Sequence, residues 1–301
     1  MPLFMLQAQE KKEDSLFIPE AKSFISKHEI INGGKTIRYI ATASETYLKN
    51  EKNTPVASIW SVAYTLEGIS DLTKRPVTFV FNGGPGSASV WMHVAYTGPK
   101  TLKIDDEGYP VQPYGVQENP YSILDVADIV FINPANTGYS RTIPMIGKEV
   151  DKSKFFGINA DIKYLAGWLN TFVSRNDRWR SPKYIIGESY GGTRVMGLAK
   201  ELQGAQWMYL NGVIMVSPAD YLVFNSDVPV ESALNLPYYT ATAWHHKVLA
   251  SELQSKDLMD VLPEAEAFAI DELMPALAKG GYISAEEKDE IATKMRTGPA
   301  N

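Results

Sequence analysis

The chain has 301 residues, of which 45% are hydrophobic and 21% charged, a composition that is too apolar for a disordered protein. Its 29 lysines and arginines against 35 aspartates and glutamates give a net charge of −6, which argues against a nucleic-acid partner. The absence of cysteine excludes disulfides and thiol nucleophiles. No apolar run approaches the ~18 residues that span a bilayer. With only four histidines, we expect no metal, and no motif predicts another cofactor.

The first residues leave two interpretations open. The apolar segment 2–6 is followed by charged residues 10–14, and it is shorter than the roughly 7–15 residues of a signal-peptide core. It is either a disordered start or the remainder of a clipped signal peptide. We therefore predict that residues 1–24 precede the folded domain, and the sequence does not define the compartment.

The next part of the chain predicts antiparallel strands. Residues 25–31 and 35–43 flank an Asn-Gly-Gly turn at 32–34, a pattern typical of a β-hairpin. Residues 57–65 are rich in β-branched and aromatic side chains and predict a third strand.

Four short apolar runs then predict buried central strands, because a continuous apolar run suits a strand that is covered on both faces. They are residues 77–81, 129–132, 184–186 and 211–216. Residues 157–172 carry apolar side chains at helical spacing between the second and third runs. This alternation predicts an α/β fold with a doubly wound, mostly parallel sheet.

After Asp220 the pattern is helical. Amphipathic stretches occupy residues 235–296, and Ser284 with Glu287 forms a capping box that opens the last helix. We predict a sheet domain over residues 25–220 and a helical cap segment over residues 221–301.

The strongest chemical motif is Gly-Glu-Ser-Tyr-Gly at 187–191, which follows a predicted strand and precedes a predicted helix at 193–202. This strand–turn–helix context is that of a nucleophile elbow, in which the serine hydroxyl of Ser189 stands clear of the sheet. The alternative is a glycine-rich turn whose serine only caps the helix.

A second motif, Asn-Gly-Gly-Pro-Gly at 82–86, follows the strand at 77–81. Its glycines leave backbone N–H groups open to a ligand. In an acyl-transfer enzyme such an N–H helps to bind the oxyanion, and losing one donor costs about 3–4 kcal/mol of transition-state stabilisation. The alternative is a tight turn with no ligand.

These two motifs, together with Asn-Pro-Tyr-Ser at 119–122 and Asn-Pro-Ala-Asn-Thr-Gly-Tyr-Ser at 133–140, resemble the serine carboxypeptidase family in order and spacing. That family includes carboxypeptidase Y and its plant relatives, and the likeness is greatest to its bacterial branch. The resemblance runs from about residue 35 to the end of the chain. It implies an α/β-hydrolase fold that removes single residues from the C-termini of peptides or proteins.

The resemblance also implies roles for six residues. Ser189 would be the nucleophile that forms an acyl-enzyme, and the backbone N–H groups of Tyr190 and Gly84 would bind the oxyanion. The substrate's terminal carboxylate would be held by Asn82, Gly83 and Glu188. A glutamate can bind a carboxylate only when it is protonated, so acidic pH should favour peptide binding. The alternative for Glu188 is a structural carboxylate that binds nearby backbone.

Three positions depart from the family pattern. Ser87 stands where many eukaryotic relatives have a cysteine, and Asn133 stands where relatives usually have an aspartate. Tyr96 takes the place of a second glutamate that would share a proton with Glu188. Without that partner, the acid preference of the site becomes doubtful.

The acid and base of the family's triad, which lie on strands beyond the helical insertion, have no counterpart before Asn301. His245 and His246 fall in a helical segment and are interpreted either as cap residues or as a substitute base. Asp220 is a candidate for the acid, and His93 is expected to pack against the core.

We therefore expect a truncated carboxypeptidase that lacks its last sheet strands and has little activity. Two alternatives stay open: a non-catalytic remnant that binds peptides or acts as a scaffold, and an acyltransferase or esterase that uses the same serine. Relatives suggest a secreted or periplasmic protein. The sequence does not define the preferred C-terminal residue or the oligomeric state.

Overall fold

The structure is a computed structural model that describes residues 18–144, 149–219 and 229–297. The chain forms two compact units, Met1–Ala219 and Asp220–Asn301, which we describe separately. Of residues 1–24, which we predict to precede the folded domain, 1–17 lie outside the described residues, and so does the candidate acid Asp220. Within the described ranges, no helix is both long enough and apolar enough to cross a membrane.

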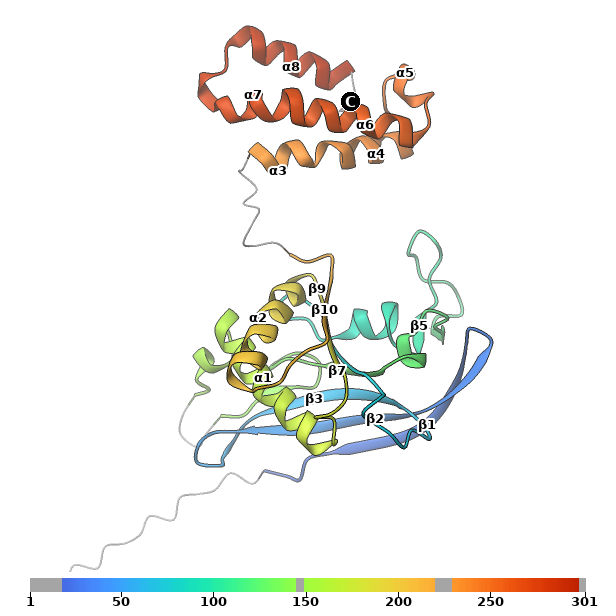
Figure 1. The fold of residues 1–301 in the computed structure, drawn as a ribbon, viewed down its shortest axis with the longest axis vertical. Coiled ribbons are helices and arrows are strands. Elements are labelled where there is room, and N and C mark those ends of the chain that lie inside the picture. Colours follow the sequence, from blue (N-terminus) through green and yellow to red (C-terminus); the bar gives the residue numbers. More distant parts are fainter. Residues whose placement is uncertain (1–17, 145–148, 220–228, 298–301) are drawn as a thin grey trace, which may run out of the picture. The chain divides into compact units, whose positions relative to one another are not determined.

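The first unit is built on one mixed sheet, with strand order β1-β2-β3-β7-β4-β9-β10 and β8 paired to β3 (Figure 1). A separate hairpin is formed by β5 and β6. The strands are β1 (Ser23–Asn32), β2 (Lys35–Lys49), β3 (Pro55–Leu66), β4 (Val77–Phe81), β5 (Lys100–Leu102), β6 (Val116–Glu118), β7 (Asp128–Ile132), β8 (Arg141–Thr142), β9 (Lys183–Glu188) and β10 (Gly212–Val216). The helices are η1 (Met92–Tyr96), η2 (Ile123–Asp125), η3 (Lys152–Lys154), α1 (Ile158–Arg175) and α2 (Tyr190–Ala205).

The N-terminal hairpin is confirmed. Gly33 and Gly34 both adopt positive φ angles, +57° and +76°, so the turn needs only these two residues and Asn32 pairs with Lys35. β1 starts at Ser23, two residues before the predicted domain boundary. β2 and β3 continue the antiparallel half of the sheet, which meets the parallel half where β3 pairs with β7.

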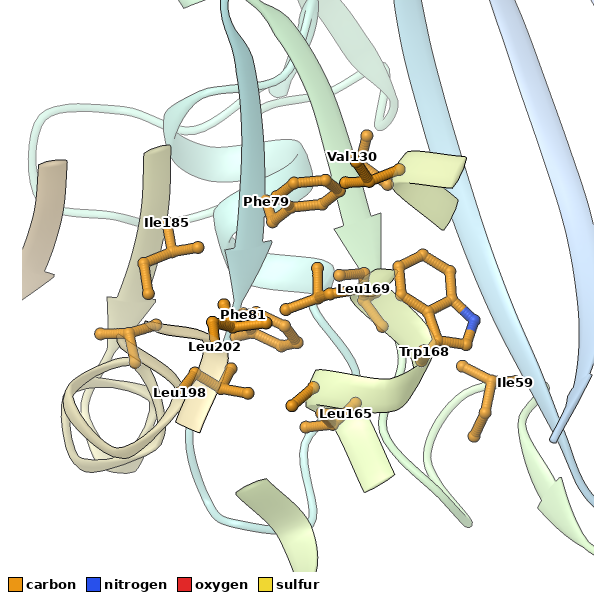
Figure 2. Close-up of a cluster of buried hydrophobic side chains, with 14 of the residues drawn as sticks. Ile59, Phe79, Phe81, Val130, Leu165, Trp168, Leu169, Ile185, Leu198 and Leu202 are labelled. Carbon is orange, nitrogen blue, oxygen red and sulfur yellow. The ribbon is translucent and has the colours of Figure 1, made fainter. Parts of the chain in front are cut away.

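The parallel strands β7, β4, β9 and β10 carry the core on their two faces. One face packs against α1 and α2, and Figure 2 shows Phe81 of β4 near Leu198 and Leu202 of α2, with Phe79 of the same strand beside Val130 of β7. The intervening Val80 belongs to the opposite face, which packs with Met92 of η1 and Leu124 of η2. Successive side chains of a strand point to opposite faces, so a fully apolar strand serves both layers.

The sequence predicts that residues 211–216 form a strand that is buried on both faces. The strand is present, but the prediction of its burial is wrong. β10 exists, but it lies at the end of the described sheet, where β9 is its pairing partner. Val213, Ile214 and Met215 are 39%, 48% and 47% exposed. An apolar run identifies a strand, but it does not state how many neighbours the strand has.

A buried ion cluster connects the N-terminal ends of the parallel strands. Asp128, at the start of β7, accepts hydrogen bonds from Nε of Arg75 at 3.0 Å and from Nη1 of Arg178. It also accepts from the backbone N–H of Leu66 at 3.0 Å. All three charged side chains are at most 7% exposed. The aspartate is therefore the common partner of two buried guanidinium groups.

The described part of the second unit, residues 229–297, is helical. Its elements are α3 (Pro229–Leu234), α4 (Leu236–His245), α5 (Ser251–Gln254), α6 (Leu258–Phe268), η4 (Ala269–Leu273), α7 (Met274–Lys279), η5 (Gly280–Tyr282) and α8 (Ala285–Thr297). Leu236 of α4, Phe268 of α6 and Leu273 of η4 share one apolar cluster. Of the predicted capping box of the last helix, the serine half is present: Ser284 Oγ accepts the backbone N–H of Glu287 at 3.1 Å.

Candidate active site

Ser189 occupies a sharp bend between β9 and α2. Its φ and ψ angles are +57° and −125°, a conformation that L-residues rarely adopt and that costs on the order of 1–3 kcal/mol. The backbone of the bend is held on both sides: Ser189 N–H donates to Val216 O at 3.0 Å, and Ser189 O accepts from Gly192 N at 2.8 Å. The serine thus stands on a strand–turn–helix bend of the kind that the motif predicts.

Glycines make this bend possible. A Cβ placed on Gly187 would lie 1.9 Å from the carbonyl oxygen of Gly191, and one on Gly192 would lie 2.7 Å from Cβ of Pro218. Both contacts are shorter than van der Waals distance. The helix can therefore start immediately after Ser189, three residues earlier than the predicted start at residue 193.

Gly187→Ala should destabilise the protein by about 1–3 kcal/mol, because the added methyl group meets backbone rather than a movable side chain. Gly204→Ala, near the C-terminal end of α2 and with nothing within 4 Å of the added atom, is the matched control and should not destabilise the protein. Chemical denaturation of the two variants measures the difference. Equal stabilities would show that the bend has room for a side chain.

The Asn82–Gly86 loop lies directly against the elbow. A Cβ on Gly83 would be 2.6 Å from the amide nitrogen of Tyr190 and 2.8 Å from Cβ of Ser189. Gly84 has a φ angle of +109°, which favours glycine at this position. The structure therefore brings together the two motifs that the sequence separates by about a hundred residues.

Asn82 and Glu188 meet beside the serine. Asn82 is fully buried; its Oδ1 accepts the backbone N–H of Met92 at 3.0 Å, so its Nδ2 is the side that faces Glu188. Nδ2 donates to Glu188 Oε2 at 2.9 Å, and Gly83 N–H approaches the same oxygen at 3.4 Å. Two donors converge on one carboxylate. This geometry fits both a subsite for a substrate carboxylate and the alternative of a structural glutamate.

His93 packs against the core, as expected. Its Nε2 is hydrogen-bonded to the Tyr64 hydroxyl at 2.6 Å, and its ring stacks on Phe131 with centroids 4.3 Å apart. Burial lowers the pKa of His93 from 6.5 to about 4, so the ring is neutral at pH 7.

The remaining histidine candidates lie in the second unit. His245 ends α4 and His246 follows it, with their ring centroids 5.1 Å apart. Within the first unit, no described residue accepts a hydrogen bond from the Ser189 hydroxyl. The role of either histidine as a substitute base stays a prediction. The ranges that the structure describes hold no group of three or more possible metal ligands from histidine and carboxylate side chains.

The positions that depart from the family pattern are structurally distinct. Tyr96 is half exposed at the end of η1. Asn133 Oδ1 accepts the backbone N–H of Ser89 at 3.1 Å, a role that the sequence did not indicate.

Asn119, from the Asn-Pro-Tyr-Ser motif, donates from Nδ2 to Tyr96 O at 2.7 Å and to Gly98 O at 2.8 Å. This motif therefore holds the end of η1 and the residues that follow it.

Sequence reasoning missed two buried charges beside the site, Arg194 on α2 and Asp161 on α1. A signal was present. Arg194 lies four and eight residues before the buried Leu198 and Leu202, and Asp161 lies four residues before the buried Leu165. A charge in register with the apolar stripe of a helix indicates a buried partner.

Comparison with known proteins agrees with this fold. The crystal structure of KEX1(delta)p, a prohormone-processing carboxypeptidase from Saccharomyces cerevisiae, matches with a TM-score of 0.52 and 18% identity, covering 85% of this chain and 52% of that one. The predicted α/β-hydrolase fold is thus confirmed.

Curated relatives are similar over part of their length. Serine carboxypeptidase-like 8 from Arabidopsis thaliana is 24% identical over 58% of this chain and 40% of its own. Serine carboxypeptidase-like 36 from the same plant is 29% identical over 52% of this chain and 31% of its own. The pheromone-processing carboxypeptidase KEX1 of Yarrowia lipolytica is 28% identical over 50% of this chain and 23% of its own. The chain thus spans less than half the length of these relatives. The family model for serine carboxypeptidase matches residues 62–266, which is more than half of the chain and includes both motifs of the site, so the chain belongs to the serine carboxypeptidase family.

Proposed function

We propose that this chain carries the nucleophile and the substrate-carboxylate subsite of a serine carboxypeptidase. The observation that supports the proposal best is the contact of the Gly83 backbone with Ser189 and Tyr190. It supports the proposal because a loop of backbone amides beside a serine on a strand–turn–helix bend offers two of the components that acyl transfer uses, a nucleophile and donors for the oxyanion.

In the proposed reaction, Ser189 Oγ attacks the carbonyl carbon of the last peptide bond and loses its proton to a general base. The carbonyl oxygen becomes an oxyanion that the N–H groups of Tyr190 and Gly84 stabilise. The C–N bond then breaks, the leaving amine takes up a proton, and the C-terminal amino acid departs. Water hydrolyses the remaining acyl-enzyme and regenerates the serine. The N-terminus of α2 adds a favourable dipole at Tyr190.

Exopeptidase specificity would come from the Asn82–Glu188 contact. The donors on Asn82 Nδ2 and Gly83 N–H already converge on one carboxylate oxygen, that of Glu188. A substrate carboxylate would bind between these donors and Glu188, and would accept the donors' hydrogen bonds instead of Glu188. Glu188 would then have to be protonated, because two carboxylates can share such a site only with a proton between them. The scissile bond would then lie one residue away, next to Ser189.

A fluorophosphonate probe tests the nucleophile. We expect covalent labelling of the full chain at Ser189, loss of labelling in Ser189→Ala, and unchanged labelling in Ser153→Ala, whose exposed serine lies in η3. A fluorophosphonate reacts rapidly only with a serine whose hydroxyl is activated, so labelling reports directly whether Ser189 is a nucleophile in this chain. Labelling that persists in Ser189→Ala would contradict the assignment.

A second candidate function is peptide binding without turnover. It is favoured by one observation: none of the described residues of the first unit accepts a hydrogen bond from the Ser189 hydroxyl. This candidate predicts no labelling, together with calorimetric binding of a peptide acid but not of its C-terminal amide. A third outcome, turnover of an ester but not of the matching blocked dipeptide, would assign an esterase or acyltransferase.

A further inference from the structure

A buried ion pair connects the two helices that cover one face of the sheet. Arg194 of α2 is 1% exposed, and its Nε lies 2.7 Å from Oδ2 of Asp161 in the first turn of α1. The other carboxylate oxygen, Oδ1, accepts the Tyr164 hydroxyl at 3.1 Å. Both oxygens of Asp161 are therefore engaged, and the carboxylate fixes the orientation of the guanidinium.

The free edge of that guanidinium holds the Asn82–Gly86 loop. Arg194 Nη1 donates to the carbonyl oxygen of Asn82 at 2.7 Å, and Nη2 donates to the carbonyl oxygen of Pro85 at 3.2 Å. The guanidinium carbon also lies 5.1 Å from the ring centroid of Tyr190. One side chain thus contacts both motifs of the candidate site, although it comes from neither.

Because the peptide unit is planar, the contact with the Asn82 carbonyl also fixes the direction of the next N–H group. In a trans peptide unit the carbonyl and the N–H of the next residue point in opposite directions. When Arg194 holds the Asn82 carbonyl toward the helices, the Gly83 N–H must point the other way, toward Glu188, and it lies 3.4 Å from Oε2. In the next peptide unit, the Gly83 carbonyl accepts Ser87 N–H at 3.1 Å, which sets the direction of the Gly84 N–H.

We propose that Arg194, oriented by Asp161, is a positioning residue that aims the amides of the Asn82–Gly86 loop at the substrate. The inference rests on the proposed function. A planar fork with donors on Nε, Nη1 and Nη2 can satisfy a carboxylate and two carbonyls at once, which the single ammonium of lysine cannot do in the same geometry. Its loss would misdirect a donor by a fraction of an ångström or more, and misplacements of about 1 Å cost roughly 10²-fold in rate.

The matched control is the other buried arginine cluster. Arg178 is also nearly fully buried and also pairs with an aspartate, Asp128, but that cluster lies at the N-terminal ends of the strands, away from the loop. Arg178→Met should therefore lower stability without moving the loop. Arg194→Met should lower stability and also change the conformation of the loop.

The experiment compares the full chain with Arg194→Met, Arg194→Lys, Asp161→Asn and Arg178→Met. Amide hydrogen exchange is measured on peptides that cover residues 82–91, below the unfolding transition of each variant. We expect exchange of the Gly83 and Ser87 amides to speed up at least ~10-fold in Arg194→Met, less in Asp161→Asn, and not in Arg178→Met. Arg194→Lys should resemble Arg194→Met. The second-order rate of fluorophosphonate labelling should fall by about 10²-fold in Arg194→Met.

The outcomes separate the two proposals. Equal loosening of residues 82–91 in Arg194→Met and Arg178→Met would reduce Arg194 to a purely structural role, and full rescue by lysine would show that charge rather than the fork matters. If Arg194→Met does not fold, Asp161→Asn, which keeps the shape of the side chain, decides the question by the same exchange measurement. If the wild-type chain is not labelled at all, the proposed function fails, while hydrogen exchange still tests the positioning role.

Discussion

Replacing Asp128 by alanine should lower the free energy of unfolding by about 3–5 kcal/mol, because two buried guanidinium groups lose their common anion. Arg75 keeps its hydrogen bonds to the carbonyls of Leu124 and Asp125, but it has no other acidic partner in the cluster. The backbone N–H of Leu66 also loses its acceptor. Chemical denaturation monitored by circular dichroism measures the loss.

Two further variants make this test specific. Asp125→Ala removes an exposed carboxylate three residues away and should change stability by less than about 0.5 kcal/mol. The triple variant Arg75→Met, Asp128→Leu, Arg178→Met replaces the whole cluster with apolar groups and should be markedly more stable than Asp128→Ala alone. A cost for Asp128→Ala no larger than that for Asp125→Ala would contradict the role of the cluster.

Acidification should destabilise the first unit through His93. Burial lowers its pKa from 6.5 to about 4, so between these pH values the unfolded chain binds a proton that the folded chain does not. The stabilisation is complete above pH 6.5 and is lost as the pH falls toward 4, by up to about 3 kcal/mol. The stacking on Phe131 and the bond to Tyr64 belong to the neutral, buried ring.

Two variants of different shape isolate this titration. His93→Phe keeps an aromatic ring and His93→Gln keeps a polar group, but neither takes up a proton in this range. Relative to wild type, both should lose less stability between pH 7 and pH 4, whatever their stability at pH 7. Denaturation curves across that range give the comparison, and NMR of the His93 ring reports its pKa directly. Parallel pH profiles for all three proteins would exclude His93 as the acid-sensitive group.

Much of the fold could be predicted from local patterns. The run Val77–Phe81 matches β4 residue for residue, because each of its five side chains is buried and the strand ends where the glycine loop begins. The start of α2 could not be predicted as well. Gly191 and Gly192 are poor helix formers, but a Cβ on Gly192 would lie 2.7 Å from Cβ of Pro218, and one on Gly191 would lie 3.1 Å from the carbonyl oxygen of Phe81, so the packing of the first turn favours both glycines. The number of neighbours of β10 is likewise set by the whole sheet rather than by its sequence.

The sequence motifs name residues that the structure brings together, but they do not name the buried residues that hold them in place. The glycine motifs name Ser189 and Gly83, whereas Arg194 and Asp161, which pair across two helices, are 33 residues apart in the sequence. Taken alone, each of these charged residues is typical of the exposed face of an amphipathic helix. Only its register with Leu198 or Leu165 shows that it faces inward, and only the packing of α1 on α2 shows what it meets.

The backbone conformation of Ser189 has a consequence for how this position is maintained. At a φ of +57° and a ψ of −125°, glycine would have less conformational strain than any residue with a side chain. If the stability of the fold were the only requirement, glycine would thus be the favoured residue at position 189. A serine at this position therefore lowers the stability of the fold relative to glycine, and under the proposed function it is a residue where the requirements of activity and of folding stability conflict.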